Sequence, residues 1–575
     1  MSTKKLILIL IAVTFLAYFS SFSNPFIWDD EQFITRNVYV QNFDIQKIFT
    51  TNTVAGAGVQ SNYYRPLTTL SFAIDAKIWG QNPFGFHLTN FLLHLGAGLM
   101  LFFLLVELFS WGAKPGTVRY LAKAGAGLYP AFFIALFFLI HPIQTEAVTY
   151  INSRGDSLYA FFLFGSLWLF ASSLRGRSKA TDAAISKGPR LLRFASYRTV
   201  LGFARNDVIR ILAVIGLFVA SLLSKEIALA GVGLFIVILI LSFFRHSADS
   251  ERSVENSRIR SWMRLTQDDN IKKGIIIIGL IVLIIIAYII LRFTVLRFAN
   301  IVNFYGGDNQ YTRSLAIRLF TFCKVLWTYL GLLLWPYPLH MERSIELVRS
   351  FFSFWVLGIL GLFGGLGIFG IFEIKKRGTA WILFGLLWFL IMLVPSSGII
   401  PINGILYEHW LYVPMVGIAI MLYGILQFLI FNFKFLIKSQ NIKYKIGNTS
   451  RKFLISFGTV IAILYIVLTI RQNNIWADPI TFYTYTLSFA PDSARLHNNL
   501  AMSYANSGQI DKAITEYKKG LALFAGYPQI HFDLGNAYVA KGEYALAKKE
   551  YEEALRLDPG FLQAKRNLEI LEKAK

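Results

Sequence analysis

Long apolar stretches separated by short polar segments dominate the first 470 residues of the chain. Eleven of them are long enough to cross a bilayer, which takes roughly 17 to 25 helical residues. They centre on residues 5–22, 88–109, 122–141, 157–174, 208–224, 227–244, 274–296, 351–372, 380–396, 410–431 and 453–470. The pattern predicts an all-α fold, a polytopic membrane helical bundle with eleven transmembrane helices.

A twelfth apolar stretch, residues 314–335, contains Arg318 and Lys324. Each such charge costs roughly 2.5 to 3.5 kcal/mol at the centre of a membrane helix. With a cytoplasmic amino terminus, the loop 175–210 lies inside and holds nine Lys or Arg against two acids. An interfacial or re-entrant segment at 314–335 places the basic loop 432–452 inside as well, in agreement with the positive-inside rule. An ordinary twelfth span is the alternative.

Composition supports a membrane protein, with 55% hydrophobic residues and a mean hydropathy of +0.52 over 575 residues. The net charge of +23 would suggest nucleic-acid binding in a soluble chain. Here the basic residues concentrate in loops between spans, so we expect no nucleic-acid partner. The single cysteine, Cys323, excludes an intramolecular disulfide. The first apolar stretch follows Lys4 and Lys5 without a small-residue cleavage site, which predicts a retained signal anchor.

A repeat begins after the last span. The stretches LAMSYANSGQIDKAITEYKKGL (500–521) and LGNAYVAKGEYALAKKEYEEAL (534–555) align at an offset of 34 residues. This period, with Leu, Tyr, Gly, Ala and Tyr at matching positions, is typical of tetratricopeptide repeats, which form pairs of antiparallel helices. We therefore predict a transmembrane domain at 1–472 and an extracytoplasmic tetratricopeptide α-solenoid at 473–575, with two full repeats, flanking half-repeats and a capping helix.

With this topology, the polar clusters of the transmembrane domain all fall on the extracytoplasmic side. They are WDDEQ (28–32), YYRPL (63–67), HPIQTEAVTYINSRGD (141–156), SKE (224–226), HMER (340–343) and LYEHW (406–410). Their convergence predicts one outward-facing site.

Asp29 and Asp30 lie in the first outer loop, residues 23–87. Adjacent carboxylates repel each other, which raises the pKa of one and suits it to accept a proton near neutral pH. The two acids could alternatively hold Mg²⁺ or Mn²⁺, which prefer hard oxygen ligands. A solvated acidic turn without chemistry is the third possibility.

Other ionisable residues lie at the predicted outer ends of spans, where such residues are functional or serve as interfacial anchors. The candidates are Arg65, Arg154, Lys225, His409, His141, Glu146, Asp156, Glu226 and Glu408.

The order of these motifs resembles that of the transmembrane and tetratricopeptide-repeat-containing O-mannosyltransferases and their prokaryotic relatives. The motifs are WDDEQFITRN, YYRPLTTLSF, FHLTNFLLH, HPIQTEAVTYINSRGDSL, SKE, VPSSGIIPINGILYEHWLYVPMVG and the terminal repeats. The resemblance covers nearly the whole chain and implies a membrane glycosyltransferase of the GT-C superfamily. It implies that Asp29 is the catalytic carboxylate, with Asp30 beside it. It also implies a polyprenyl- or dolichyl-phosphate sugar, mannose by preference, as co-substrate from the outer leaflet.

Glycosyl transfer from a lipid phosphate needs a base for the acceptor hydroxyl, negative charge near an oxocarbenium-like transition state, and cations for the departing phosphate. Asp29 suits the first two tasks. The phosphate-binding candidates are Arg65, Arg154, Lys225 and His409, and the supporting candidates are His141, Glu146, Asp156, Glu226 and Glu408. Many family members carry Arg at the position of His409, so a phosphate contact there would depend on pH.

A single displacement would invert the anomeric carbon, and segment 314–335 would border the groove for the lipid chain. The acceptor is expected to be a protein Ser or Thr brought by the repeats. The short repeat array and the single cysteine favour a bacterial or archaeal plasma membrane over the endoplasmic reticulum. The alternative function is a non-catalytic, membrane-anchored scaffold whose repeats recruit extracytoplasmic proteins.

Overall fold

The computed structural model describes residues 1–59, 61–111, 127–174, 205–250, 269–294, 296, 310–377, 379–399, 404–436 and 440–573. The regular structure in these ranges is entirely helical. The chain forms two compact units. The transmembrane unit comprises Met1–Phe22, Asp29–Tyr337 and Ile345–Ile470, and the C-terminal unit comprises Ser23–Trp28, Pro338–Ser344 and Arg471–Lys575.

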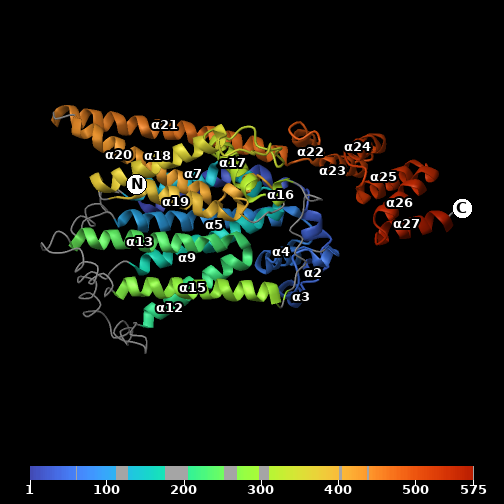
Figure 1. The fold of residues 1–575 in the computed structure, drawn as a ribbon, viewed down its shortest axis with the longest axis horizontal. Coiled ribbons are helices and arrows are strands. Elements are labelled where there is room, and N and C mark those ends of the chain that lie inside the picture. Colours follow the sequence, from blue (N-terminus) through green and yellow to red (C-terminus); the bar gives the residue numbers. More distant parts are fainter. Residues whose placement is uncertain are drawn as a thin grey trace. The chain divides into compact units, whose positions relative to one another are not determined.

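Each of the eleven predicted spans coincides with a helix, which confirms the predicted all-α membrane fold (Figure 1). The helices are α1 (Thr3–Tyr18), α5 (Pro83–Ser110), α7 (Leu128–Ile140), α9 (Arg154–Ser173), α12 (Arg205–Ser224), α13 (Gly231–Ser250), α15 (Asp269–Thr294), α18 (Phe354–Arg377), α19 (Trp381–Leu393), α20 (Pro414–Leu436) and α21 (Gln440–Ile475). By length and composition, eight helices of the described ranges are candidate spans, or nine if α7 and the bent segment after it count as one. Helices α19 and α20 are shorter apolar helices. Residues 175–204, 251–268 and 437–439, which carry much of the charge behind the sidedness prediction, lie outside the described residues.

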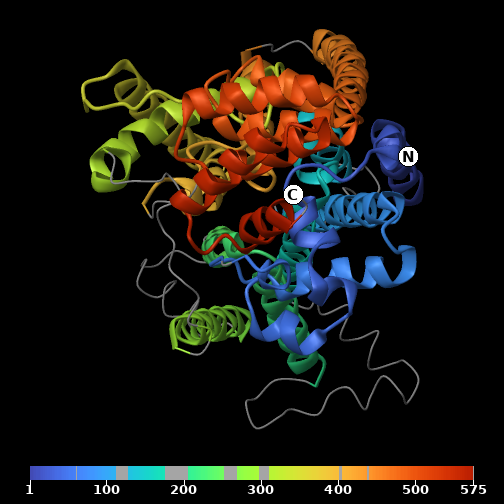
Figure 2. The ribbon, with the colours of Figure 1, turned by 90° about the vertical axis from the view of Figure 1, so that its right-hand side faces the viewer.

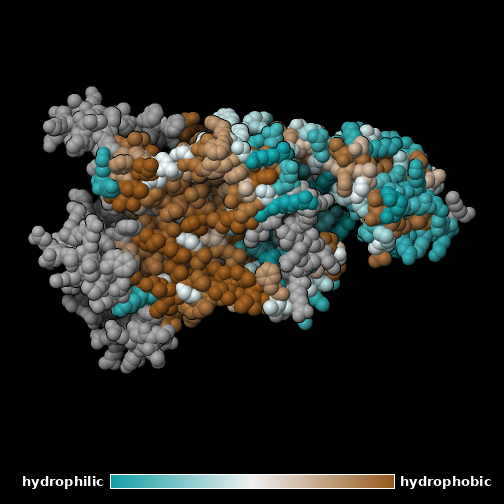
Figure 3. Space-filling model, viewed as in Figure 1, coloured by the Kyte–Doolittle hydropathy of each residue, from teal (hydrophilic) through white to brown (hydrophobic). Residues whose placement is uncertain are grey.

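The helices of the transmembrane unit present a broad hydrophobic band on the face seen in Figure 3. Figure 2 looks nearly along the long helices, so that α15 appears almost end-on. Inside the bundle, glycines let helices approach closely. A Cβ atom on Gly385 of α19 would collide with the carbonyl of Gly417 in α20, and the reverse also holds. Small residues at helix crossings allow the backbone contact that stabilises membrane bundles.

Further helices lie between the predicted spans of the transmembrane unit. They are the π-helix η2 (Glu31–Thr35), α2 (Val38–Gln41), α3 (Ile45–Thr50), α4 (Pro66–Trp79), α8 (Thr145–Val148), α16 (Gln310–Arg313) and α17 (Leu315–Leu334). Four of them, η2 and α2 to α4, belong to the predicted outer loop 23–87 and connect α1 to α5.

Helix α17 corresponds to the predicted interfacial segment. It is long and apolar enough to be a candidate span. Three of its polar contacts lie at successive positions of the helix. Arg318 donates to the carbonyl of Gly398, Tyr329 donates to that of Tyr407, and the carbonyl of Leu333 lies 3.2 Å from His141 Nε2. Gly398 and Tyr407 lie in the connection between α19 and α20, and His141 directly follows α7. These partners therefore mark one end of the bundle. A spanning helix would pass from one end of the bundle to the other. These contacts agree with an interfacial helix, and interfacial placement stays our prediction.

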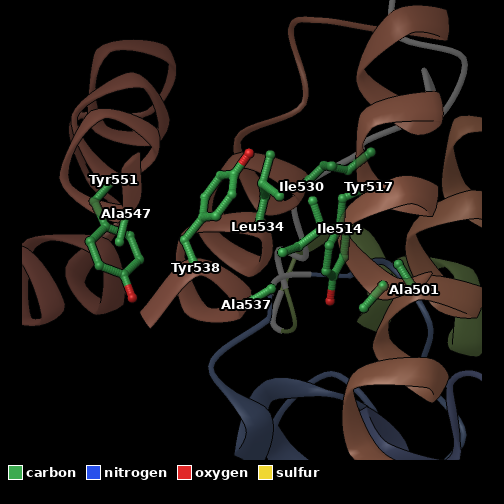
Figure 4. Close-up of a cluster of buried hydrophobic side chains, with 10 residues drawn as sticks. Ala501, Ile514, Tyr517, Ile530, Leu534, Ala537, Tyr538, Ala547 and Tyr551 are labelled. Carbon is green, nitrogen blue, oxygen red and sulfur yellow. The ribbon is translucent and has the colours of Figure 1, made fainter. Parts of the chain in front are cut away.

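The C-terminal unit has the predicted repeat architecture. Its helices are α22 (Pro479–Leu487), α23 (Ala494–Asn506), α24 (Ile510–Leu523), α25 (Pro528–Lys541), α26 (Tyr544–Leu557) and the capping α27 (Leu562–Lys573). Gly508 and Gly542, which match in the repeat, have φ of 77° and 81° after α23 and α25. Glycine adopts this left-handed conformation at helix ends without a steric penalty. The helix pairs bury small residues and tyrosines, including Ala513, Tyr517 and Tyr551, in one core (Figure 4).

A histidine and a glutamate join the two helices of each repeat. His497 Nδ1 lies 2.7 Å from Glu516 Oε2, and 34 residues later His531 Nδ1 lies 2.6 Å from Glu550 Oε2. The other ring nitrogen of each histidine lies 3.1 Å from a carbonyl oxygen, that of Pro491 or of Ala525. The hydrogen bond that His531 donates to Glu550 raises the pKa of His531, and burial opposes this effect.

Two short segments that the sequence analysis placed in the domain 1–472 belong to the C-terminal unit, namely Ser23–Trp28 and Pro338–Ser344. Hydrogen bonds explain their placement. The Asn24 side chain donates to the carbonyl of Asn473 at 3.1 Å, and Gln472 donates to that of Leu339 at 3.1 Å.

Candidate active site

The segment between α7 and α9, residues 141–156, organises the predicted site and is a broken helix. Pro142 lacks a backbone N–H and cannot continue α7, so the chain bends by 52°. The 3-10 turn Pro142–Gln144, helix α8 and a second 3-10 turn, Ile151–Ser153, follow. Asn90 on α5 donates its side-chain amide to carbonyls of this segment, those of Val148, Tyr150 and Ile151. Because the helix is broken, successive polar side chains of this segment reach different partners.

This segment holds both adjacent acids. The Tyr150 hydroxyl accepts a hydrogen bond from the backbone N–H of Asp29 at 3.1 Å. The backbone N–H of Asn152 donates to Asp30 Oδ1 at 2.8 Å. Asp30 is only 1% exposed, whereas Asp29 is half-buried. Of the two neighbours, Asp29 is therefore the more accessible to a substrate, and Asp30 is held inside.

The backbone around the acids is unusual. Trp28 has a φ of 60°, in the left-handed region that bulky residues rarely adopt. The residues after Asp30 form the π-helix Glu31–Thr35, and such π turns are frequent at functional sites. A strained conformation persists only when surrounding contacts impose it, and it occurs most often at active sites and ligand clamps.

Two ion pairs lie next to each other at the start of α9 and the end of α12. Lys225 Nζ lies 2.7 Å from both carboxylate oxygens of Asp156, and Arg65 Nε lies 2.9 Å from Glu226 Oε2. Burial lowers the pKa of Lys225, Asp156 opposes this, and the nearby Arg65 reinforces it. The Lys225 and Asp156 side chains are 6% and 1% exposed, whereas that of Arg65 is 18% exposed. Arg65 thus forms the more accessible part of this cationic cluster.

Arg292, near the end of α15, is a member of the cluster that sequence reasoning missed. Its Nη1 lies 4.0 Å from Glu226 Oε1, and its Nη2 donates to the carbonyl of Asn62. The sequence analysis counted Arg292 inside the predicted span 274–296. An arginine so near the end of an apolar run was the available signal.

His409 pairs with Glu146. Its Nδ1 lies 2.7 Å from Glu146 Oε1, and its backbone N–H donates to Glu146 Oε2 at 3.0 Å. Burial and the nearby Lys225 lower the pKa of His409 to about 3, and Asp156 opposes this. When the imidazole is neutral, donation from Nδ1–H to Glu146 leaves Nε2 as a hydrogen-bond acceptor. In this state His409 suits a hydroxyl group rather than a phosphate oxygen.

Arg154 lies inside the protein and is committed to structural contacts. Its Nη2 pairs with Asp75 Oδ2 at 2.6 Å, and its Nε donates to Asn90 Oδ1 at 2.6 Å. It also contacts Ser71 and the carbonyl of Phe86, and its side chain is 0% exposed. Arg154 is thus held by contacts inside the protein, and its predicted contact with a lipid phosphate stays a prediction. Asp30 lies near enough to act electrostatically on Arg154, which links this network to the acid pair.

His141 and Glu408 are both buried. His141 is fully buried, its Nδ1 accepts the N–H of Ile143, and its Nε2 lies 3.2 Å from the carbonyl of Leu333. Both ring nitrogens are used to cap the break after α7 and to hold α17. Glu408 is 2% exposed, in the 3-10 turn Glu408–Leu411.

Within the described ranges, no three His, Cys, Asp or Glu side chains are placed to hold a metal ion together. A divalent ion at Asp29 and Asp30 would therefore need further ligands from its substrate, such as phosphate oxygens.

The structure thus connects most of the predicted residues through residues 141–156. Glu146 contacts His409, Tyr150 and Asn152 hold Asp29 and Asp30, and Asp156 contacts Lys225. One short stretch of chain therefore contacts both the accessible Asp29 and, through Asp156, the Lys225 of the cationic cluster. Chemically, this combination suits proton removal from a hydroxyl beside a leaving phosphate.

Comparisons with known proteins agree with the repeat assignment. Residues 503–542 match a family described as TPR repeat, and residues 528–561 match the tetratricopeptide repeat family.

Most of the chain aligns with curated relatives. It is 24% identical to the human protein O-mannosyl-transferase TMTC4 over 530 residues, which cover 88% of this chain and 64% of that protein. It is 23% identical to the protein O-mannosyl-transferase F38B6.6 of Caenorhabditis elegans, covering 91% of this chain and 63% of that protein. The chain therefore spans somewhat less than two thirds of the length of these relatives.

Among solved structures, the chain is similar to the oligosaccharyltransferase AglB from the archaeon Archaeoglobus fulgidus, in complex with an inhibitory peptide and a dolichol-phosphate. The TM-score is 0.39 at 12% identity, over 83% of this chain and 56% of that chain. Taken over most of its length, the chain resembles the protein O-mannosyl-transferases of the TMTC type, and its C-terminal unit carries tetratricopeptide repeats.

Proposed function

We propose that this protein is a membrane glycosyltransferase that moves mannose from a polyprenyl- or dolichyl-phosphate donor to a protein Ser or Thr on the extracytoplasmic side. The observation that carries the proposal is the half-buried Asp29, attached through residues 141–156 to a cluster of cations. The relatives named above, protein O-mannosyl-transferases, support the reaction class.

The proposed reaction is a single displacement. The Asp29 carboxylate takes the proton of the acceptor hydroxyl, and the hydroxyl oxygen forms a bond to the anomeric carbon of the sugar. The bond from that carbon to the phosphate oxygen breaks, and the lipid phosphate leaves with the electron pair. The configuration at the anomeric carbon is inverted. Asp30, held by Asn152, keeps Asp29 in place and adds negative charge near the oxocarbenium-like transition state.

The leaving phosphate needs accessible cations. Arg65 and Arg292 are the best placed, because their side chains are 18% and 24% exposed and both lie at Glu226. Lys225 is buried near Arg65 and adds positive charge to the cluster. We assign Arg154 a positioning role, since it binds Asp75 and Asn90. Asn90 in turn donates to the backbone of residues 141–156, which contact Asp29 and Asp30. His409 is assigned to a sugar hydroxyl through its Nε2.

The decisive experiment measures transfer of radiolabelled sugar from polyprenyl-phosphate mannose to membrane protein. Asp29→Asn should lose at least roughly a hundredfold, the range expected for a general base. The matched control is Glu31→Gln, two residues away, whose carboxylate is 42% exposed and pairs with Arg36. This control should keep its activity, provided both variants are folded and inserted to the same extent.

Other outcomes would replace the proposal. Equal loss in Asp29→Asn and Glu31→Gln would refute Asp29 as the base. If the wild type transfers no sugar from mannose, glucose or N-acetylhexosamine donors while its repeats still capture extracytoplasmic proteins, the protein is a membrane-anchored scaffold.

A further inference from the structure

Glu226 is shared by the two accessible arginines of the cationic cluster, and all three residues belong to the transmembrane unit. Its Oε2 lies 2.9 Å from Arg65 Nε, and its Oε1 lies 4.0 Å from Arg292 Nη1. The same Oε1 accepts a hydrogen bond from the backbone N–H of Tyr64 at 3.1 Å. The side chains of Arg65, Glu226 and Arg292 are 18%, 19% and 24% exposed, so each of them is partly accessible to a ligand.

Three separate elements bring these charges together. Arg65 directly precedes α4, Glu226 begins the 3-10 helix η7 (Glu226–Ala230), and Arg292 lies near the end of α15. Arg292 also donates from Nη2 to the carbonyl of Asn62. A guanidinium carries five N–H donors, so each arginine can bind a second anion while it contacts Glu226. A phosphate bound by the two arginines would therefore lie next to the Glu226 carboxylate.

The charges of this cluster do not cancel. Arg65 and Arg292 are two cations around the single carboxylate of Glu226. The neighbouring ammonium of Lys225 lies 2.7 Å from both oxygens of Asp156, so that buried pair is balanced within itself. In the part of the cluster that the structure describes, one positive charge thus remains for a ligand.

The proposed reaction changes the charge of the lipid. The sugar-bearing donor is a phosphodiester with a single negative charge, whereas the lipid phosphate that leaves is a monoester with a charge of about −1.5 to −2 at pH 7. A site with one available positive charge matches the donor and leaves part of the charge of the product uncompensated. Without Glu226, the same two arginines would match the product and retain it.

We infer that Glu226 is a specificity-determining residue, which disfavours the lipid phosphate product relative to the sugar-bearing donor. This inference rests on the proposed function, because the two ligands are the donor and the product of the proposed transfer. Glu226 repels each negative charge on a bound phosphate, and the product carries nearly twice the charge of the donor. Repulsion of one ligand more than another creates selectivity without any new attractive contact.

The test measures the binding of two sugar-free lipids to the full chain in phosphatidylcholine nanodiscs at pH 8. The probes are polyprenyl phosphate and its methyl phosphodiester, which have the same lipid chain and differ in charge. Glu226→Gln removes the carboxylate charge and keeps the length of the side chain, whereas Glu226→Asp keeps the charge. The matched control is Glu31→Gln, which removes a carboxylate that is 42% exposed and pairs with Arg36.

Two unit charges about 4 Å apart in the dielectric of water interact with an energy equal to about fivefold in affinity. We therefore expect Glu226→Gln to bind the diester about fivefold and the monoester about 25-fold more tightly than the wild type does. The preference for the monoester then rises about fivefold, and the ratio of the polyprenyl phosphate inhibition constant to the donor KM in mannose transfer should fall by the same factor. Glu226→Asp and Glu31→Gln should keep the wild-type preference.

Arg292→Gln tests the same charge count from the opposite side. Loss of one positive charge should lower the preference for the monoester about fivefold. This second variant decides the matter if Glu226→Gln does not fold.

The outcomes separate the inference from the proposed function. An unchanged preference in folded Glu226→Gln or in folded Arg292→Gln, or an equal rise in Glu31→Gln, would overturn the inference alone, provided the wild type transfers mannose. A wild type that transfers no mannose would overturn the proposed function, and with it the role of Glu226 in choosing donor over product.

Discussion

Loss of Asp156 is expected to destabilise the transmembrane unit strongly, because it would leave the ammonium of Lys225 buried without its partner. Lys225 Nζ is 2.7 Å from both oxygens of Asp156, and the two side chains are 6% and 1% exposed. Breaking such a pair by removing one member costs about 3–5 kcal/mol. We therefore expect Asp156→Asn and Lys225→Met each to lower the free energy of unfolding by about that amount.

The double variant should behave differently. In Asp156→Asn/Lys225→Met no charge is left unpaired, and replacement of a buried ion pair by groups of similar volume is often close to neutral. We expect its stability to return to within about 1 kcal/mol of the wild type, which corresponds to a strong coupling energy between the two positions. The assay is equilibrium unfolding in mixed micelles, followed by tryptophan fluorescence.

The pair Lys273 and Asp207 provides the matched control. Its atoms are 2.8 Å apart, but its side chains are 14% and 20% exposed. Partial hydration lowers the cost of removing one partner, so we expect about 1 kcal/mol or less for Lys273→Met. Additive losses in the Asp156 and Lys225 variants, or losses no larger than those of the control, would refute the buried pairing.

The double variant also tests the role of Lys225 in the reaction. Because it should fold, its activity can be measured without a loss of structure. If Lys225 supports the leaving phosphate, sugar transfer should fall about a hundredfold, as on loss of other groups that stabilise developing negative charge. Wild-type turnover in a folded double variant would remove Lys225 from the site.

Three further changes give distinct expectations. Arg154→Met should lower the free energy of unfolding by about 3–5 kcal/mol, because it leaves the buried Asp75 carboxylate without its ion-pair partner. Transfer assays on monodisperse protein should show a smaller loss of activity per folded molecule for Arg154→Met than for Arg65→Gln. Since the folded pKa of His531 is raised, its stabilising effect is complete below the unfolded pKa and is lost as the pH rises through the folded pKa. Exchange protection of α25, corrected for intrinsic rates, should therefore be higher at pH 6 than at pH 8, and His531→Gln should flatten this difference. Spin labels at Leu319→Cys and Leu334→Cys, with Cys323 replaced by serine, should report equal membrane depth if α17 lies along the surface, whereas a spanning α17 would separate them by about 22 Å.

The helices and repeats could be predicted because they depend on local pattern. Apolar runs long enough to cross a bilayer allow little besides a helix, since the backbone must satisfy its own hydrogen bonds there. The 34-residue period likewise fixed both repeats, including the glycines at 508 and 542. The same offset relates His497 to His531 and Glu516 to Glu550.

The partners within the site could not be predicted, because they join residues that are far apart in the chain. Lys225 pairs with Asp156 rather than with its neighbour Glu226, which pairs with Arg65. Nothing in the sequence chooses between these pairings. The partner of Arg154 is Asp75, in the middle of α4, and no motif marks it. A charged residue near a span end has the same sequence signal whether it binds a substrate or another side chain.

The broken helix at residues 141–156 explains why so many groups converge on one stretch. In an unbroken α-helix, Glu146, Tyr150 and Asp156 would be ordered along one cylinder and could not turn independently toward separate loops. The break at Pro142 and the two 3-10 turns let Glu146 reach His409, Tyr150 reach Asp29 and Asp156 reach Lys225. Contacts that share one backbone segment are coupled, so substitutions in this stretch should be non-additive. The acid pair and the cationic cluster are therefore expected to respond together when any one of these anchors is lost.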